Sequence, residues 1–195
     1  MLFDDDSRID LLYCTAEEVE GVISRHAIGR PIKCLLDKDG CLQNLPVADR
    51  NHYNINKINE KSFDHACVEF FWEIQNVVKG IKRDELSYTM FFLRDIGMRD
   101  MLNRMVDNYI AMHNNYSVTV GALGRHRKKF LSDGLYELYK NTYLSNTVDD
   151  VWASLEYMVD LFSLTGMKIA DVCGYHYPKS DELYMRDYIK KMKER

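Results

Sequence analysis

A single acid stands between apolar residues near the start of the chain. Asp10 is flanked by Ile9 and Leu11, and alternation along a β-strand would place these two on one sheet face and Asp10 on the other. A carboxylate fixed in this way, instead of carried on a mobile loop, is suited to a catalytic role. The alternative is an outward-facing acid on a half-exposed strand.

A second set of chemically useful side chains shares one face of a predicted helix. Glu69, Trp72, Asn76, Lys79 and Arg83 follow one another at intervals of three or four residues. An acid, an aromatic ring, an amide and two bases on one face indicate a surface that faces a ligand. The alternative is a surface stripe on which Trp72 packs against another helix.

A run of basic residues follows a glycine-containing connection. Arg125 and Lys128 belong to this run, which covers residues 124–129 at the start of a predicted helix. Backbone N–H groups and several cations gathered there would suit a phosphate. An exposed basic turn explains the same residues without a ligand.

The elements that position these residues differ between the two ends of the chain. Residues 1–14 have the pattern of a β-hairpin around an Asp-Asp-Asp-Ser turn, followed by a short helix over about 15–23 and a strand over 32–36. Residues 41–55 have no periodicity and are interpreted as a linker. Two strands alone have only marginal stability in water, so the hairpin that begins at Met1 is expected to be part of a larger sheet.

Helical spacing dominates the rest of the chain. The apolar residues Phe63, Cys67, Phe70, Ile74, Val77 and Ile81 step by four and three, which indicates one face of a long helix. Further helices are predicted over about 84–112, 125–143 and 147–173, and from Ser180 to the end. The predicted fold class is therefore α+β, with a domain at 1–45 and a helical bundle at 56–195.

Composition excludes several classes of function. The chain has 195 residues, a hydrophobic fraction of 46% and a formal charge of -4, which are typical of a soluble globular protein without a nucleic-acid partner. We find neither a membrane-spanning run nor a signal peptide, so the cytoplasm is the expected compartment. Five cysteines without a C-x-x-C pair are expected to be free thiols, and the histidines have no zinc-site spacing.

Several motifs together resemble a known family. Met1-Leu-Phe-Asp-Asp and Ile9-Asp10-Leu11 are followed by Leu35-Leu36-Asp37-Lys38-Asp39, Glu69-Phe70-Phe71-Trp72, the run from Val78 to Glu85 and Val151-Trp152-Ala153-Ser154-Leu155. Their order and approximate spacing resemble those of the aminoglycoside 6-adenylyltransferases, the streptomycin-modifying resistance enzymes. The resemblance covers nearly the whole chain.

The resemblance implies a fold and a reaction. It implies the remnant of a polymerase-β-type nucleotidyltransferase sheet in residues 1–45, followed by a helical domain. It also implies transfer of AMP from Mg-ATP to an aminoglycoside hydroxyl, with Mg²⁺ as the metal and ATP as co-substrate.

Roles for individual residues follow from the resemblance. Asp10 corresponds to the third catalytic acid, which acts as a base or helps to hold the metal. Lys79 and Arg83 would face the triphosphate, with Arg125 or Lys128 contacting phosphate from the loop. The substrate residues would be Glu69, which binds a cationic group such as a guanidinium, and Trp72.

The chain departs from the family pattern in one respect that affects activity. The Gly-Ser motif and the D-x-D pair that bind metal in the family have no counterpart here, since Asp37 and Asp39 follow a different strand without a preceding Gly-Ser. We therefore expect a chain truncated at its N-terminus and inactive, or nearly so, as a transferase. A non-catalytic helical module that binds a ligand or a partner is the alternative. Open strand edges also predict self-association.

Overall fold

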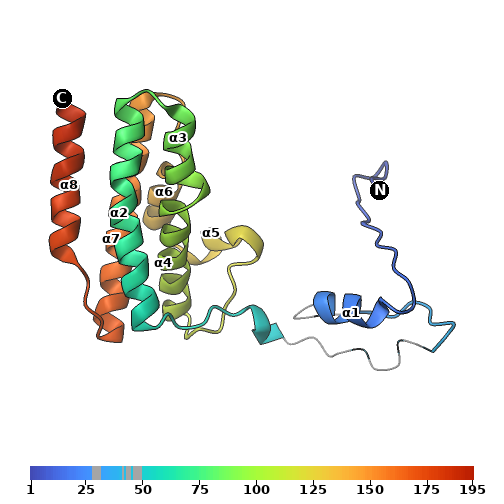
Figure 1. Ribbon diagram of the computed structural model, residues 1–195. Helices are drawn as coiled ribbons and strands as arrows, with labels where there is room; N and C mark the ends of the chain where they lie inside the picture. The colour runs from blue at the N-terminus through green and yellow to red at the C-terminus, as the bar shows by residue number, and fades with distance from the viewer. Residues whose placement is uncertain (28–31, 41, 43–44, 46–49) are drawn as a thin grey trace. The chain divides into compact units, whose positions relative to one another are not determined.

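The computed structural model describes residues 1–27, 32–40, 42, 45 and 50–195. These residues form two compact units, Met1–Tyr53 and Asn54–Arg195 (Figure 1).

The first unit contains little regular structure. A helix α1 spans Val19–Ala27, and a 3-10 helix η1 spans Arg50–Tyr53. The first residues fold back on themselves, because the Ile9 N–H donates to the Met1 carbonyl at 2.9 Å. The tip of this turn contains Asp6 with a positive φ of 62°.

The predicted sheet is not found among the residues that the structure describes. Leu2 and Arg8 form one isolated antiparallel bridge, and residues 32–36 are irregular. The prediction of an α+β fold with a remnant of a nucleotidyltransferase sheet is therefore wrong. The physical reason is that alternation around Asp10 satisfies the pattern of a strand, whereas a two-stranded ribbon needs further strands or a packed helix to persist.

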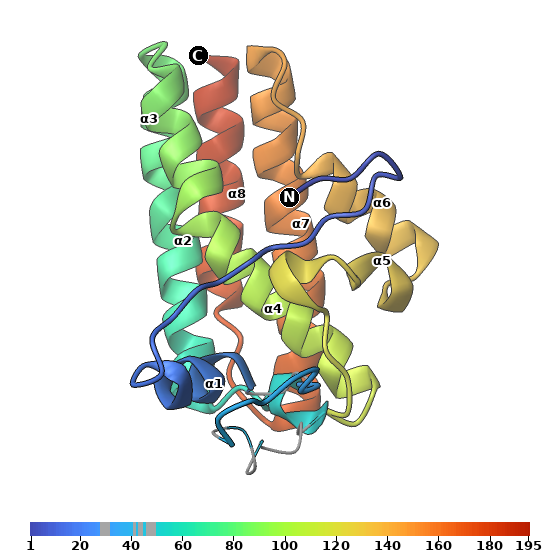
Figure 2. The same cartoon turned by 90° about the vertical axis from the view of Figure 1, so that its right-hand side faces the viewer.

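The second unit is built from helices. They are α2 (Glu60–Lys82), α3 (Leu86–Met90), the π-helix η2 (Phe91–Asp95), α4 (Met98–His113), the 3-10 helix η3 (Ala122–Gly124), α5 (Arg127–Phe130), α6 (Asp133–Asn141), α7 (Val148–Cys173) and α8 (Lys179–Glu194). The long helices α2, α7 and α8 run side by side, and α4 packs against both α2 and α7 (Figure 2).

Local signals explain where the two longest helices begin. The Asn59 side chain caps α2 by accepting from the Ser62 N–H at 2.8 Å. At the start of α7, Thr147 and Asp150 form a reciprocal capping box, in which each side chain accepts from the other residue's backbone N–H.

The helix predicted over 84–112 is interrupted. After α3, the Ile96 N–H donates to the Phe91 carbonyl at 3.0 Å, which is the i to i+5 bond of a π turn. Gly97 follows with φ of 63°, a conformation that ends the helix and starts α4 in a new direction. Asp84, at which the predicted helix begins, also has a positive φ, and the cap position of α3 is taken by Glu85.

Aromatic stacking joins the two central helices. Phe70 of α2 and Phe162 of α7 are fully buried, with ring centroids 3.9 Å apart and planes 6° from parallel. Leu102 and Met105 of α4 are also fully buried, beside the α7 residues Leu155 and Met158. Burial of these apolar side chains is the main force that holds α2, α4 and α7 together.

A buried ion network attaches α8. Glu182 is 1% exposed and accepts from Ser163 Oγ, Lys179 Nζ and Arg186 Nε at 2.8 to 2.9 Å. Burial opposes the charged carboxylate, but these donors outweigh it and keep the pKa of Glu182 below its ordinary value of 4.5. Arg186 also donates to Asp160 of α7 at 2.6 Å, so α8 is tied to α7.

Within the described part of the chain, none of the helices combines the length and the apolar character needed to cross a bilayer.

We expect Glu182→Gln to lower the free energy of unfolding by about 2 kcal/mol at pH 7, because the buried side chain loses its charge-assisted hydrogen bonds to Lys179 and Arg186. The folded-state pKa of Glu182 is lowered, so its stabilisation is present above pH 4.5 and is lost as the pH falls through the folded value. The difference between the two proteins should therefore shrink in acid. Urea unfolding followed by circular dichroism at pH 7 and pH 3.5 measures both effects.

The matched control is Asp187→Asn on the same helix, because Asp187 pairs with Lys191 at the exposed surface. It should change stability by less than about 0.5 kcal/mol. Equal stability of the Glu182 and Asp187 variants at pH 7 would contradict the role of the buried network.

Candidate functional site

A polar cleft of about 600 Å³ runs along α4. Its α4 wall carries Asp100, Asn103, Arg104, Asp107 and Asn108, which share one helix face at spacings of three and one residues. The other lining residues are Ile55, Arg94, Arg99, Leu123, Arg127 and Tyr143. The second wall includes Leu123 of η3, Arg127 of α5 and Tyr143, which follows α6; Figure 2 shows α5 on the same side of the bundle as α4. The volume lies in the range of small-molecule sites.

Arg127 and Asp107 form a two-pronged ion pair in the wall of the cleft. Arg127 Nε and Nη2 donate to the two Asp107 carboxylate oxygens at 2.7 and 2.8 Å, and Nη1 donates to the Tyr139 hydroxyl at 2.7 Å. Burial opposes the charge of Arg127, but Asp107 outweighs it and raises the pKa of the guanidinium. Burial, followed by the hydrogen bond with Tyr143, raises the pKa of Tyr139 to about 12.

Gly124 makes room for this guanidinium. It has a positive φ of 74°, and a Cβ at this position would collide with the end of the Arg127 side chain. The glycine therefore serves the cleft by allowing the backbone of η3 to approach Arg127 closely.

Arg99 is buried at the base of the cleft with 7% exposure. Nη1 donates to Thr142 Oγ1 at 2.8 Å, and Nη2 donates to the Thr142 carbonyl at 2.6 Å. The ring of Tyr143 covers the guanidinium at 4.1 Å from Cζ to the ring centroid. Burial lowers the pKa of Arg99, although the group stays charged in any ordinary solution.

Arg94 approaches the same tyrosine. Its Cζ lies 5.6 Å from the centroid of the Tyr143 ring, and Nη2 donates to the Leu144 carbonyl at 2.8 Å. Burial lowers the pKa of this guanidinium as well. The Arg94 Nε is buried without a hydrogen-bond partner.

The stripe predicted on α2 lies outside this cleft. Glu69 is half-buried, while Trp72, Lys79 and Arg83 are exposed. Trp72 lines a groove of about 270 Å³ between α2 and α8, together with Asp181 and Tyr184. Figure 1 shows α8 and α5 on opposite sides of the bundle, so the groove and the cleft are separate surfaces.

The two basic residues predicted for a phosphate lie next to the cleft but do not line it. Arg125 and Lys128 are exposed, and Lys128 Nζ lies 5.7 Å from the centroid of the Tyr136 ring. The phosphate contacts of Arg125 and Lys128 stay a prediction, whereas Arg127 of the same basic run, which was not predicted, lines the cleft. Arg94 and Arg99 were not predicted either, because their partners Leu144 and Thr142 lie far away in the sequence.

Asp10 belongs to the first unit. Its carboxylate accepts from Arg8 Nη2 at 2.6 Å, and its side chain is 74% exposed. Among the described residues, no group of three or more His, Cys, Asp or Glu side chains is placed to hold a metal ion. The described residues around Asp10 therefore do not fit a magnesium site.

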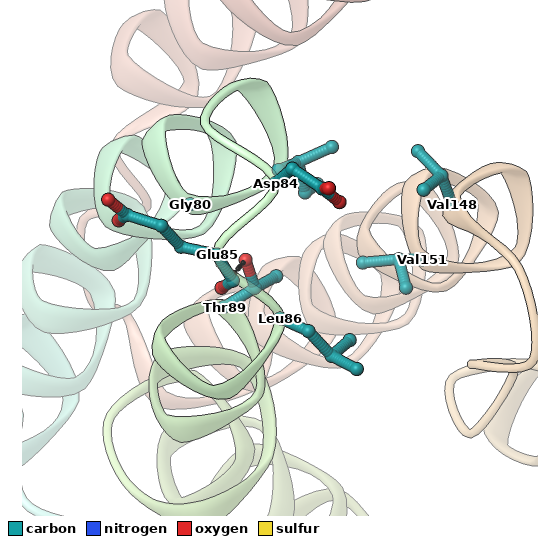
Figure 3. A pocket seen from close by; sticks show the side chains of 8 residues that line it. Gly80, Asp84, Glu85, Leu86, Thr89, Val148 and Val151 are labelled. Carbon is teal, nitrogen blue, oxygen red and sulfur yellow. Dashed lines mark hydrogen bonds between the residues drawn. The ribbon is translucent and has the colours of Figure 1, made fainter.

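A smaller pocket lies where the α2–α3 connection faces the first turn of α7 (Figure 3). Figure 3 shows Asp84 and Leu86 opposite Val148 and Val151 across it. Its volume is about 40 Å³, which is an order of magnitude below that of a typical ligand site. This pocket is too small for a nucleotide or an aminoglycoside.

Comparison with known proteins supports the resemblance found in the sequence. Residues 1–192 match a family model described as streptomycin adenylyltransferase. The chain is 28% identical over 194 residues to an aminoglycoside 6-adenylyltransferase of Campylobacter jejuni, covering 100% of this chain and 66% of the relative. It is 30% identical over 182 residues to that of Bacillus subtilis, covering 93% and 63%. The predicted family resemblance is therefore confirmed.

A solved structure is similar as well. The crystal structure of an aminoglycoside 6-adenyltransferase from Bacillus subtilis superposes with a TM-score of 0.63 at 29% identity, over 90% of this chain and 63% of that one. The chain thus spans just under two thirds of the length of these relatives.

We expect Asp107→Asn to lower the free energy of unfolding by about 3 kcal/mol, because it leaves the Arg127 guanidinium buried without an anion. Thermal and urea unfolding measure the loss. Asp100→Asn makes the same change on the same helix face, at an exposed residue 3.4 Å from Arg104, and should cost less than about 0.5 kcal/mol. If the two variants were equally stable, Asp107 would have no structural role in the cleft.

Proposed function

Because the chain belongs to the streptomycin adenylyltransferase family, we propose that it acts in the chemistry of an aminoglycoside 6-adenylyltransferase, the transfer of AMP from ATP to an aminoglycoside hydroxyl. The observation that carries this proposal is the match to the family model over residues 1–192. We further propose that these 195 residues bind ligands but do not catalyse the transfer by themselves.

The proposed lack of turnover follows from the number of catalytic carboxylates that the chain provides. The family's chemistry uses three acids, and by resemblance Asp10 is the counterpart of one of them. A single carboxylate, here also paired with Arg8, would hold a divalent cation weakly. By resemblance, the proposed role of Asp10 is to accept the proton of the attacking hydroxyl.

The groove beside Trp72 is the proposed aminoglycoside site. Aminoglycosides carry ammonium or guanidinium groups, which bind to aromatic faces and to carboxylates. Trp72 is 62% exposed, and Asp181 and Tyr184 share its groove. Glu69 lies one turn before Trp72 on α2, and its carboxylate is the second group proposed to bind a cationic part of the substrate.

The nucleotide contacts proposed at Lys79, Arg83, Arg125 and Lys128 stay predictions. All four side chains are exposed and free to move toward a phosphate. Lys79 and Arg83 also lie at the carboxyl end of α2, where positive charge stabilises the helix dipole without any ligand.

A partner-binding module is the second candidate function. It is favoured by exposed apolar side chains in the first unit, among them Leu11, Leu12, Leu35 and Leu36. Residues of this kind are typical of surfaces that another protein segment covers. Self-association through this unit belongs to the same proposal.

We expect the purified chain to release no pyrophosphate above the background without protein when it is mixed with Mg-ATP and streptomycin. A coupled pyrophosphate assay measures the rate. Sustained turnover would contradict the proposed inactivity, and Asp10→Asn would then have to abolish it if Asp10 is the base.

Binding of streptomycin is expected to change the fluorescence of Trp72. The chain has two tryptophans, and the other, Trp152, is buried at 5% exposure. Saturable quenching should therefore disappear in Trp72→Phe and persist in Trp152→Phe, which is the matched control. Quenching that survives in Trp72→Phe would remove the groove from the proposal.

A further inference from the structure

The cleft along α4 has an excess of positive charge. Four guanidinium groups line it, from Arg94, Arg99, Arg104 and Arg127, against two carboxylates, from Asp100 and Asp107. The difference is two positive charges. A cleft of this charge repels a cationic aminoglycoside and attracts an anion.

Two of the four arginines that line the cleft form no ion pair with a carboxylate in the described part of the chain. Asp107 is held by Arg127 through both oxygens, and Asp100 lies 3.4 Å from Arg104. In the described ranges of the chain, no ion pair includes Arg94 or Arg99, which donate instead to the carbonyls of Leu144 and Thr142. The excess charge is therefore located on these two guanidinium groups.

Burial makes the unmatched charge costly. Both guanidinium groups lie against the Tyr143 ring, so they repel each other at short range. The pKa of Arg99 is lowered by burial and also by Arg94 and Arg127. The Arg94 Nε, buried without an acceptor, has lost its water without gaining a partner. An anion in the cleft would offset the repulsion between the two guanidinium groups and the cost of burying their charge.

We propose that the cleft is a binding site for linked phosphate groups, with Arg94 and Arg99 as its principal cations and Arg104 at its rim. Guanidinium forks match phosphate oxygens in pairs, and two adjacent phosphoryl groups match the charge excess. The Asn103 amide lines the same space and offers neutral donors. The volume of about 600 Å³ accommodates more than a single phosphate.

This inference rests on the proposed function, in which ATP is the co-substrate, and adds a site for its linked phosphates that is separate from Lys79 and Arg83. Direct titration tests this site without requiring AMP transfer, so failure of one proposal is distinguishable from failure of the other. Linked phosphates come from free pyrophosphate or from the end of a nucleoside triphosphate. The two sources share the chemistry that the cleft recognises, and separate titrations distinguish them.

The test is isothermal titration of the full chain with pyrophosphate, ATP and AMP, each without metal. We expect saturable binding of pyrophosphate and of ATP, and at least tenfold weaker binding of AMP. Binding of AMP as tight as that of ATP would overturn the proposal, because the linked phosphates would then contribute nothing. Absence of saturable pyrophosphate binding would also overturn it.

Variants locate the site. Arg94→Met should weaken pyrophosphate binding about tenfold, the effect of one charge-assisted hydrogen-bonding group. Arg195→Met makes the same change at the exposed end of α8 and should leave affinity within twofold. Because Arg94 also bonds to Leu144, Arg104→Met provides a second variant at an exposed residue, with an expected loss of about threefold. Equal affinities of the Arg104 and Arg195 variants in folded protein would overturn the assignment.

Discussion

The buried guanidinium of Arg99 is the constraint on which the shape of the cleft depends. An arginine does not lose its proton inside a protein, so a side chain with 7% exposure must find acceptors within the fold. Thr142 provides two acceptors, and Ser154 of α7 donates to the same Thr142 carbonyl at 2.6 Å. The connection between α6 and α7 is therefore held across α4, and this path places Tyr143 over the cation. Through its hydroxyl, 2.9 Å from that of Tyr139, the network continues to Arg127.

Elements with a local cause were predictable from the sequence, whereas those with a distant cause were not. The apolar period on α2 identified Phe63, Phe70 and Ile74, which are fully buried, and the helix predicted over 147–173 corresponds to α7, Val148–Cys173. The hairpin failed because alternation around Asp10 is a property of the segment, while a sheet requires neighbouring strands. Arg99, in contrast, makes contacts that the sequence did not predict. Its acceptor lies 43 residues away, and no spacing within the chain indicates such a pair.

The residues of the candidate site also differ in whether a local or a distant cause positions them. Trp72 was predicted to face a ligand because a tryptophan is unusual on a solvent-exposed helix face, and the structure exposes it in a groove. Within the basic run, composition could not tell Arg127 from Arg125, because the difference lies in the backbone at Gly124 and in the position of Asp107 twenty residues earlier. Arg94 and Arg99 are five residues apart, a separation that does not place two side chains on one face of a continuous α-helix. Their convergence on Tyr143 depends on the break between them.

Because of that break, the position of Arg94 depends on the number of residues in the segment between α3 and α4. In the π turn over Phe91–Asp95 each bond spans one residue more than in an α-helix, so the turn acts as a single inserted residue. Deleting one residue there would restore ordinary winding and shift the angular phase of the flanking positions by about 100°. Arg94 would then turn away from the aromatic ring while every amino acid around the cleft stayed the same. For this segment, insertions and deletions are more damaging than most exchanges of side chains.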